Sequence, residues 1–480
     1  MKRVIMAVVA LLVVASGLAI YTAVTHTKAA VTTCGDPRDE MFCSSWVGSS
    51  FYVFDTGSET SPNPGLANST INEEAGDLGL NVVKYEMLTA PCGLTDNATG
   101  CTTPEEVDAA LDGIQERDLS ATPLVVLPPV VNTCPEDKEC TSAYTDQCDT
   151  GDWAWDGDGS SEGSGFTMLA WDEWLITEAT NDGVFLFELG NEPDNYCDTG
   201  MQSSYRDDGD PSWACTTTGD EQSDHVTSYS YENLWDCVVP ALRAFARANG
   251  LGEIYIGGPA WSTWDDDTAD IADHNYTASN LWDIEEFVRH EVAEYNLTGD
   301  SDYIPDFVSV HTYLPATPGG NDTYDTETIG DQLVNEMATS EDLSNAESKA
   351  STQIATWSDG FNDLQTWMDE NVSDYSIGGE KLNDYIKIVD SEYDDTPNAS
   401  DTVNTTQAYS QDWCDWYYTQ MFNMLNDDNL WGSVQFALSG GNATQGTLGD
   451  LNLIDPATGD ENDCYSSFQD KERLRHSQKA

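Results

Sequence analysis

The chain has 480 residues, of which 86 are Asp or Glu and only 18 are Lys or Arg, so its formal net charge is −68. Hydrophobic residues make up 39% of the sequence and aromatic residues 10%, which is too apolar for a disordered acidic segment. A surface this negative repels nucleic acids and anionic membranes, which excludes partners bound through phosphate groups.

The first thirty residues differ in composition from the rest of the chain. Lys2 and Arg3 precede an apolar run that extends to about Val24, and small residues follow it. This order is typical of a secretory signal peptide over residues 1–30. A run of about twenty apolar residues can also cross a bilayer, so an uncleaved membrane anchor is the alternative. We therefore expect a secreted protein, or one anchored at the cell surface.

The cysteines and the glycosylation sequons agree with that compartment. All 12 cysteines lie after residue 30, and an even number in mostly polar segments favours disulfides formed in an oxidising environment. Short spacings favour the pairs Cys34–Cys43 and Cys92–Cys101, although the sequence does not determine the connectivity. Nine Asn-x-Ser/Thr sequons indicate a glycoprotein.

After the signal segment, short apolar stretches alternate with stretches of helical periodicity. Strands are expected at Phe51–Asp55, Asn81–Met87, Thr122–Pro128, Val184–Glu192, Glu253–Gly258, Asp306–Tyr313, Tyr385–Glu392 and Trp431–Leu438. The helices expected between them include Pro104–Arg117, Tyr231–Ala248, Ala278–Tyr295, Thr352–Glu370 and Ser410–Leu425.

Eight such repeats predict an α/β fold, a single (β/α)₈ TIM barrel over residues 31–445, followed by a C-terminal extension over 446–480. An open doubly wound sheet is the alternative, but the glycine-rich turn expected after its first strand is missing. Long polar stretches at 134–165, 197–226 and 315–350 follow three of the predicted strands. We expect them to form long, disulfide-bearing loops at the C-terminal face, where such barrels build their sites.

Two of the predicted strands run into a glutamate. The fourth ends in Gly-Asn191-Glu192-Pro, and the seventh ends in Asp390-Ser-Glu392. The carboxyl ends of these strands face one another across the mouth of a barrel. Two carboxyl groups so placed suit glycosidic cleavage, in which one protonates the leaving oxygen and the other attacks the anomeric carbon.

Each of these residues also has a plainer interpretation. Glu192 could be an exposed strand end, and His311, on the sixth strand, could be an ordinary core histidine. Asp390 competes with Glu392 because the two-residue period of a strand places it on the same face, one step deeper. With six histidines and no HExxH motif in the sequence, we expect no catalytic metal and no cofactor.

Asn191-Glu192-Pro193 on the fourth strand, together with Glu392 on the seventh, resembles the clan GH-A glycoside hydrolases. The longer string Glu188–Asp194 is most similar to the subgroup that contains heparanase and β-glucuronidases. The resemblance implies a retaining double displacement with Glu192 as the acid/base and Glu392 as the nucleophile. It also implies that Asn191 binds the 2-hydroxyl of the sugar.

The same resemblance implies roles for residues on the sixth and second predicted strands. His311 and Tyr313 share one face of the sixth strand, where the clan often has a His or Tyr that positions the nucleophile. Many members carry an Arg near the nucleophile at the end of the second strand, whereas this sequence offers only Lys84 there. The subgroup usually adds a β-sandwich after the barrel, but only about forty residues follow the eighth predicted strand. The resemblance therefore extends over the barrel and its two carboxylates. It does not assign the sequence to a particular family within the clan.

Several tryptophans fall in the loops expected after strands three, four and five, where their rings could stack on sugars or pack disulfide-rich loops. They are Trp153, Trp155, Trp213, Trp261 and Trp264. Three further aromatic residues, Trp413, Trp416 and Tyr417, lie on a predicted helix and are expected in the core.

The expected partner is an oligo- or polysaccharide, and the protein is expected to be a monomer that meets a membrane only if its N-terminal segment is retained. The acidic surface favours solubility in high salt and a neutral glycan, and it argues against heparan or other polyanionic substrates. The alternative function is a non-catalytic barrel that binds glycan or forms part of a surface glycoprotein.

Overall fold

The computed structural model describes a subset of the chain, which excludes the predicted signal segment and most of the three long polar stretches. The described residues are 42, 45–52, 77–86, 107–108, 111–112, 121–127, 168–191, 228–261, 280–313, 343–394, 411–427, 429–439, 453–454, 461 and 464–479. The pairs Cys34–Cys43 and Cys92–Cys101 lie outside these residues. None of the described helices has the length and apolar composition needed to cross a bilayer.

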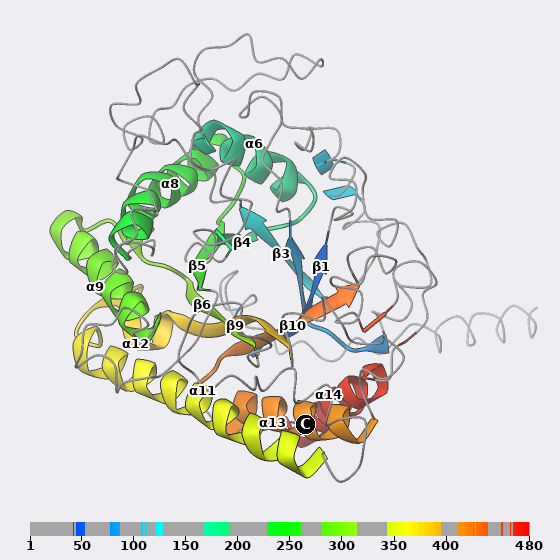
Figure 1. The fold of residues 1–480 in the computed structure, drawn as a ribbon. Helices are drawn as coiled ribbons and strands as arrows, with labels where there is room; N and C mark the ends of the chain where they lie inside the picture. Colours follow the sequence, from blue (N-terminus) through cyan, green and yellow to red (C-terminus); the bar gives the residue numbers. More distant parts are fainter. Residues whose placement is uncertain are drawn as a thin grey trace, which may run out of the picture. The chain divides into compact units, whose positions relative to one another are not determined.

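Eight parallel strands close into a barrel at the centre of the helices (Figure 1). Around the barrel they are β1 (Val47–Tyr52), β2 (Val82–Glu86), β3 (Thr122–Leu127), β4 (Leu186–Leu189), β5 (Tyr255–Trp261), β6 (Phe307–Tyr313), β9 (Lys387–Asp394) and β10 (Gly432–Ser439), which pairs with β1. The fold is therefore a (β/α)₈ TIM barrel, as the alternation of strands and helices predicted.

The helices form an outer layer around the strands (Figure 1). They are α6 (Met168–Asn181), α8 (Ser228–Asn249), α9 (Asn280–Thr298), α11 (Leu343–Asn371), α13 (Gln411–Asp427) and α14 (Tyr465–Lys479). Shorter elements are η4 (Ser301–Tyr303), α12 (Leu382–Tyr385) and a hairpin of β7 (Ser376–Ile377) and β8 (Glu380–Lys381). α11 begins nine residues before the predicted helix, so the polar stretch after β6 is shorter than expected.

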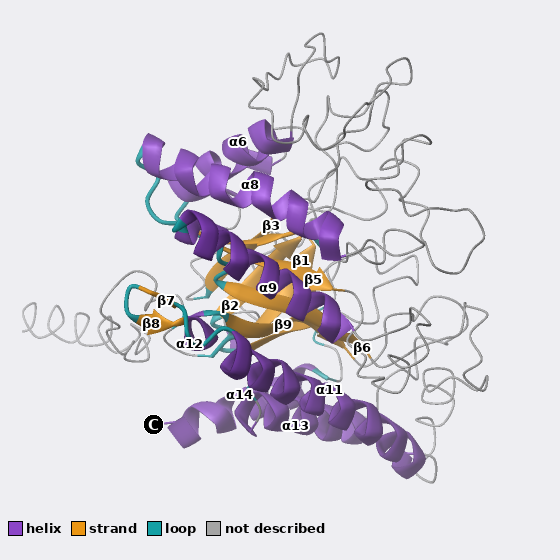
Figure 2. Cartoon of the chain, turned by 90° about the vertical axis from the view of Figure 1, so that its left-hand side faces the viewer, coloured by secondary structure: helices purple, strands orange, loops and turns teal. Residues whose placement is uncertain are grey.

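α11, α13 and α14 lie side by side along one flank of the barrel (Figure 2). Trp413 and Tyr417 on α13 are buried in the core and Trp416 packs against it, which confirms the prediction for this helix. A disulfide joins Cys414 on α13 to Cys464, the residue before α14. The segment after β10 therefore contributes a helix to the outer layer.

The first strand begins at Val47, four residues earlier than predicted. The prediction missed this start because the small and polar residues Gly48, Ser49 and Ser50 resemble a loop. Val47 donates its N–H to Oδ1 of Asn81 at 2.7 Å and accepts a hydrogen bond from the N–H of Asn81 at 3.0 Å, which fixes the start of β1 beside β2. A side chain at Gly48 would place its Cβ 2.8 Å from the carbonyl oxygen of Val82. Small residues are needed here because the neighbouring strand approaches closely.

The interior of the barrel is apolar at the amino ends of the strands and polar toward their carboxyl ends. Alternation along the strands directs a buried apolar set inward: Val82, Leu124, Leu186, Phe307 and Val389. The ring of Phe307 lies 5.3 Å from that of Trp46, and it fills the space that a Cβ on Gly257 would need. These rings pack at the amino ends of the strands, away from the polar carboxyl ends.

A buried ion pair near the amino ends of β5 and β6 joins the helix layer to the barrel. Arg243 on α8 contacts Oδ2 of Asp306 at 2.6 Å and donates to the carbonyl oxygens of Asp302 and Ile304 at 2.6 and 2.8 Å. Asp306 also accepts the N–H of Ile256 at 2.9 Å. Every one of these groups is held between α8, η4 and the first residues of β5 and β6.

Replacing Arg243 with Met is expected to lower the free energy of unfolding by about 3 kcal/mol, because Asp306 would remain buried without its counter-ion. Arg247 is the matched control, since it pairs with Asp302 but its side chain is 58% exposed. Arg247→Met should cost less than about 1 kcal/mol. Urea unfolding followed by tryptophan fluorescence measures both, and equal losses would contradict the structural difference between the two arginines.

Candidate active site

Lys84 is the centre of a buried polar cluster inside the barrel. Its side chain, on β2, is fully buried, and its Nζ lies 2.9 Å from Oε2 of Glu188 on β4 and 3.0 Å from Oε1 of Glu392 on β9. Oδ1 of Asn191, just after β4, is 3.4 Å from the same Nζ. The ammonium group of Lys84 therefore links β2 to β4 and β9, and its positive charge balances part of the negative charge of the two carboxylates.

His311 on β6 contacts the same lysine and the same glutamate. Its Nε2 lies 3.5 Å from Nζ of Lys84, and its Nδ1 lies 3.3 Å from Oε2 of Glu392. Because the ammonium group can only donate, Nε2 accepts and the proton belongs on Nδ1, which donates to the carboxylate. Both oxygens of Glu392 thus face a donor, and this arrangement stabilises a negative charge on that side chain.

An irregularity in the pairing of β6 and β9 determines which acid joins the cluster. Val310 pairs with Asp390, but the next residue, His311, pairs with Glu392, so Ser391 is an extra residue on β9. An extra residue of this kind redirects the side chains that follow it. Glu392 consequently lies on the face of His311, inside the barrel.

The prediction that Asp390 shares the face of Glu392 was therefore wrong. Asp390 accepts a hydrogen bond of 2.5 Å from Oγ1 of Thr312, a residue that alternates with His311 and faces away from the barrel interior. Burial raises the pKa of the Asp390 carboxyl well above its ordinary value, and the hydrogen bond from Thr312 opposes this shift only in part. The bulge therefore separates Asp390 from the cluster inside the barrel. Burial in its own environment favours the neutral form of the Asp390 carboxyl group.

Four of the residues singled out in the sequence lie together: Lys84, Asn191, His311 and Glu392. Glu192 lies outside the described residues, as does the side chain of Tyr313.

Trp261 corrects another expectation. It is the last residue of β5 instead of part of the loop after it, and it is only 2% exposed and packed in the hydrophobic core. The backbone register of β5 and β6 shifts between Pro259 and Trp261, which turns the ring into the core. Its predicted place in a loop was therefore wrong, whereas its predicted contact with a sugar stays a prediction. The other four loop tryptophans lie outside the described residues.

Glu188 is the member of the cluster that the sequence analysis missed. It is fully buried and, apart from its ion pair with Lys84, neither of its carboxyl oxygens makes an aligned hydrogen bond with a described residue. The available signal was a charged residue inside the apolar run Val184–Leu189, since a buried charge requires a partner.

Neither the family models nor the curated proteins compared with this sequence match it. Solved structures of similar fold exist. A glucosidase from Croceicoccus marinus is 11% identical with a TM-score of 0.44, over 90% of this chain and 66% of that chain. A family 39 glycoside hydrolase from Bacteroides cellulosilyticus WH2 is 11% identical with a TM-score of 0.42, over 87% of this chain and 63% of that chain.

A broad-specificity GH5-4 endoglucanase from Clostridium longisporum is 10% identical with a TM-score of 0.41, over 89% of this chain and 96% of that chain. The chain spans about two thirds of the length of the first two structures, and at these identities the likeness concerns the fold alone.

The chemistry of the cluster follows from its contacts. Glu392 is 3% exposed and lies near the carboxyl end of β9. It is held by one cation and one imidazole, which fix both of its oxygens. A carboxylate fixed in this way near the carboxyl ends of the barrel strands can act as a nucleophile or stabilise a developing positive charge.

Proposed function

We propose that this protein is a secreted, retaining β-glycoside hydrolase in which Glu392 is the nucleophile and Glu192 is the acid/base. The observation that supports this most directly is the Glu392 carboxylate, which contacts Lys84 and His311 inside the barrel. In the sequence, Asn-Glu-Pro comes directly after β4, and its Glu192 is the proposed second carboxyl group.

In the first step, Glu192 gives its proton to the glycosidic oxygen while an oxygen of Glu392 bonds to the anomeric carbon and the leaving alcohol departs. In the second step, Glu192 takes a proton from water, which attacks the same carbon and releases Glu392 as a carboxylate. The two inversions retain the configuration of the sugar.

The neighbouring residues position this reaction. Lys84 and His311 hold the nucleophile by its two oxygens and so reduce the orientations it can adopt. Oδ1 of Asn191 faces the lysine, which leaves its amide N–H groups to donate to a hydroxyl of the sugar.

A neutral oligo- or polysaccharide is the proposed substrate. The net charge of −68 repels anionic chains, and added salt screens this repulsion progressively. The N-terminal segment, the cysteines and the sequons support an extracellular location.

Hydrolysis of a panel of β-glucans, xylans, mannans and galactans tests the activity. Glu192→Gln is expected to lower the rate by about 10²–10⁴-fold on glycans, because the leaving oxygen would depart without a proton. The loss should be much smaller for aryl glycosides whose leaving group is already a stable anion. Glu253→Gln, on an exposed residue before β5, should hydrolyse every substrate like the wild type.

If neither the glycans nor the aryl glycosides are cleaved by the wild type, the barrel is not a glycosidase. In a crystal structure, the carboxyl group of Glu192 should lie about 5–5.5 Å from that of Glu392. A separation of about 6.5–9.5 Å would instead indicate an inverting enzyme.

A further inference from the structure

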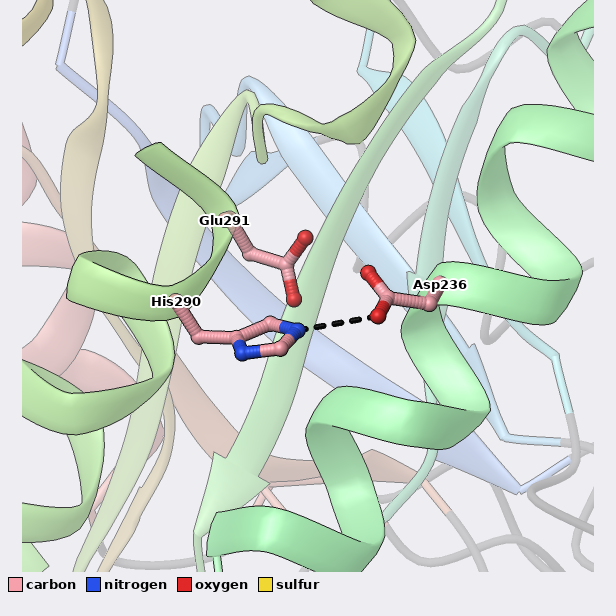
Figure 3. Close-up of side chains that lie close together, drawn as sticks. All are labelled: Asp236, His290 and Glu291. Carbon is pink, nitrogen blue, oxygen red and sulfur yellow. Dashed lines mark hydrogen bonds and ion pairs between the residues drawn. The ribbon is translucent and has the colours of Figure 1, made fainter. Parts of the chain in front are cut away.

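A second cluster of ionisable residues lies in the helix layer, outside the strands. Asp236 projects from α8, and His290 and Glu291 project from α9 toward the same point between the two helices (Figure 3). One potential ligand atom from each residue lies within 4.8 Å of the others. Nε2 of His290 is 2.9 Å from Oδ2 of Asp236, and Glu232, one turn before Asp236, has Oε2 3.8 Å from Nδ1 of His290.

Glu291 is the unusual member of this cluster. It is fully buried and points into the space between the helices (Figure 3). No donor among the described residues faces either of its carboxyl oxygens, and the side-chain group it contacts is the carboxyl group of Asp236. Oδ1 of Asp236 is likewise buried without such a partner. Unpaired buried carboxyl oxygens are costly, so native structures satisfy them with a proton, a cation or a donor.

The charges around the cluster favour a cation. Glu232, Asp236 and Glu291 place three carboxyl groups around one imidazole, and His290 is the only cationic partner that the described residues give them. Glu291 is fully buried beside the carboxyl group of Asp236, so both its burial and this neighbour disfavour a negative charge on it. A divalent ion would remove both penalties at once, because it compensates the burial and the repulsion between the carboxylates.

We propose that Asp236, His290 and Glu291 form a binding site for a divalent transition metal, with Zn²⁺ as the best fit, that links α8 to α9. The imidazole nitrogen favours such a metal over Ca²⁺ or Mg²⁺, which prefer oxygen ligands alone. One nitrogen, two carboxylate oxygens and a water complete a tetrahedral set. The side chains of His290 and Asp236 are 29% and 27% exposed, which leaves a route for the ion and its water.

The site is structural and separate from hydrolysis, since its ligands belong to the helix layer while Lys84 and Glu392 lie inside the barrel. Two helices that follow consecutive strands would be joined by the metal in the folded chain. We therefore expect Zn²⁺ to stabilise the protein whether or not it cleaves a glycan.

The test uses the full chain, freed of metal with a chelator and then titrated with ZnCl₂ by calorimetry. Millimolar CaCl₂ is present throughout to occupy all-oxygen sites on the acidic surface. We expect one Zn²⁺ per chain with a Kd in the micromolar range or below. At a hundredfold excess over Kd, Zn²⁺ should raise Tm by about 3 °C, given the entropy of unfolding of a domain this size.

Three variants decide between the site and its alternatives. His290→Gln and Glu291→Gln should each weaken Zn²⁺ binding by about 100-fold and abolish the shift in Tm. Glu294→Gln removes a nearby charge on the same helix without removing a ligand, so its affinity should stay within about twofold of the wild type. His290 is partly exposed, so its variant is expected to fold even if Glu291→Gln does not.

Two outcomes would overturn the site. If the wild type binds no Zn²⁺ under these conditions and Glu291→Gln keeps the wild-type Tm, Glu291 is simply a protonated acid. If the wild type and His290→Gln bind Zn²⁺ equally, the ion is held elsewhere on the acidic surface.

Discussion

Replacing Glu392 with Gln is expected to lower the rate of glycan hydrolysis by about 10⁴-fold or more, because the amide cannot form the covalent intermediate. The substitution keeps the shape of the side chain, and Lys84 can still donate to its oxygen, so the fold should be retained. Initial rates on the best substrate of the panel, measured with protein whose circular dichroism matches the wild type, give the size of the loss.

Asp390→Asn is the control for this experiment, because Asp390 lies two residues away on the same strand. Burial favours its neutral form, and Asn preserves both that neutrality and an acceptor for Thr312. We expect a loss of less than about tenfold. A larger loss for Asp390→Asn than for Glu392→Gln would transfer the role of nucleophile to Asp390.

Chemical rescue separates a nucleophile from a residue that merely supports the site. In Glu392→Ala the deleted carboxylate leaves a space that azide or formate can enter. Azide should restore part of the rate on aryl glycosides and yield a glycosyl azide of inverted configuration, which nuclear magnetic resonance identifies. If azide gives neither a higher rate nor an azide product, the role of Glu392 in covalent catalysis is contradicted.

Lys84→Met is expected to destabilise the protein by about 3–5 kcal/mol, because it removes the cation from two buried carboxylates. Met fills the volume of the lysine stem without its charge, so the loss reflects electrostatics more than packing. Urea unfolding measures the free energy, and activity measured well below the transition reports separately on the orientation of Glu392.

A double-mutant cycle isolates the contribution of Glu188. Glu188→Gln removes one of the two carboxylates that Lys84 neutralises, so it should cost less in the Lys84→Met background than in the wild type. We expect a coupling energy of about 1–3 kcal/mol between the two positions. Strictly additive effects would mean that the 2.9 Å contact between Lys84 and Glu188 contributes no stability.

The sequence predicted the barrel because helical segments alternate with short apolar strands. Some of these, such as β3, are buried on both faces and are nearly continuous apolar runs. Its weakest predictions fall where other parts of the fold decide the structure. Gly48 and Ser49 look like a loop, yet strands on both sides pair with them. Among the described side chains of α14, the buried apolar ones are Tyr465 and Phe468, so its signal is weak until α13 and the disulfide are considered.

The candidate site divides in the same way. The sequence by itself determined which residue types lie at the carboxyl ends of the strands, because a strand end marked by Asn-Glu-Pro or by Glu392 can be read from local composition. It could not show that Lys84 and Glu188 are partners, since they are distant in the chain and meet only when the barrel closes.

Only the tertiary structure decided which acid on β9 faces inward. A two-residue period assigns Asp390 and Glu392 to one face, but the pairing with β6 places an extra residue between them and reverses that assignment. Asp236 and His290 likewise meet only because α8 and α9 pack together. Local periodicity therefore determined the elements of this protein, whereas the closure of the barrel and the packing of its helices determined which charges became neighbours.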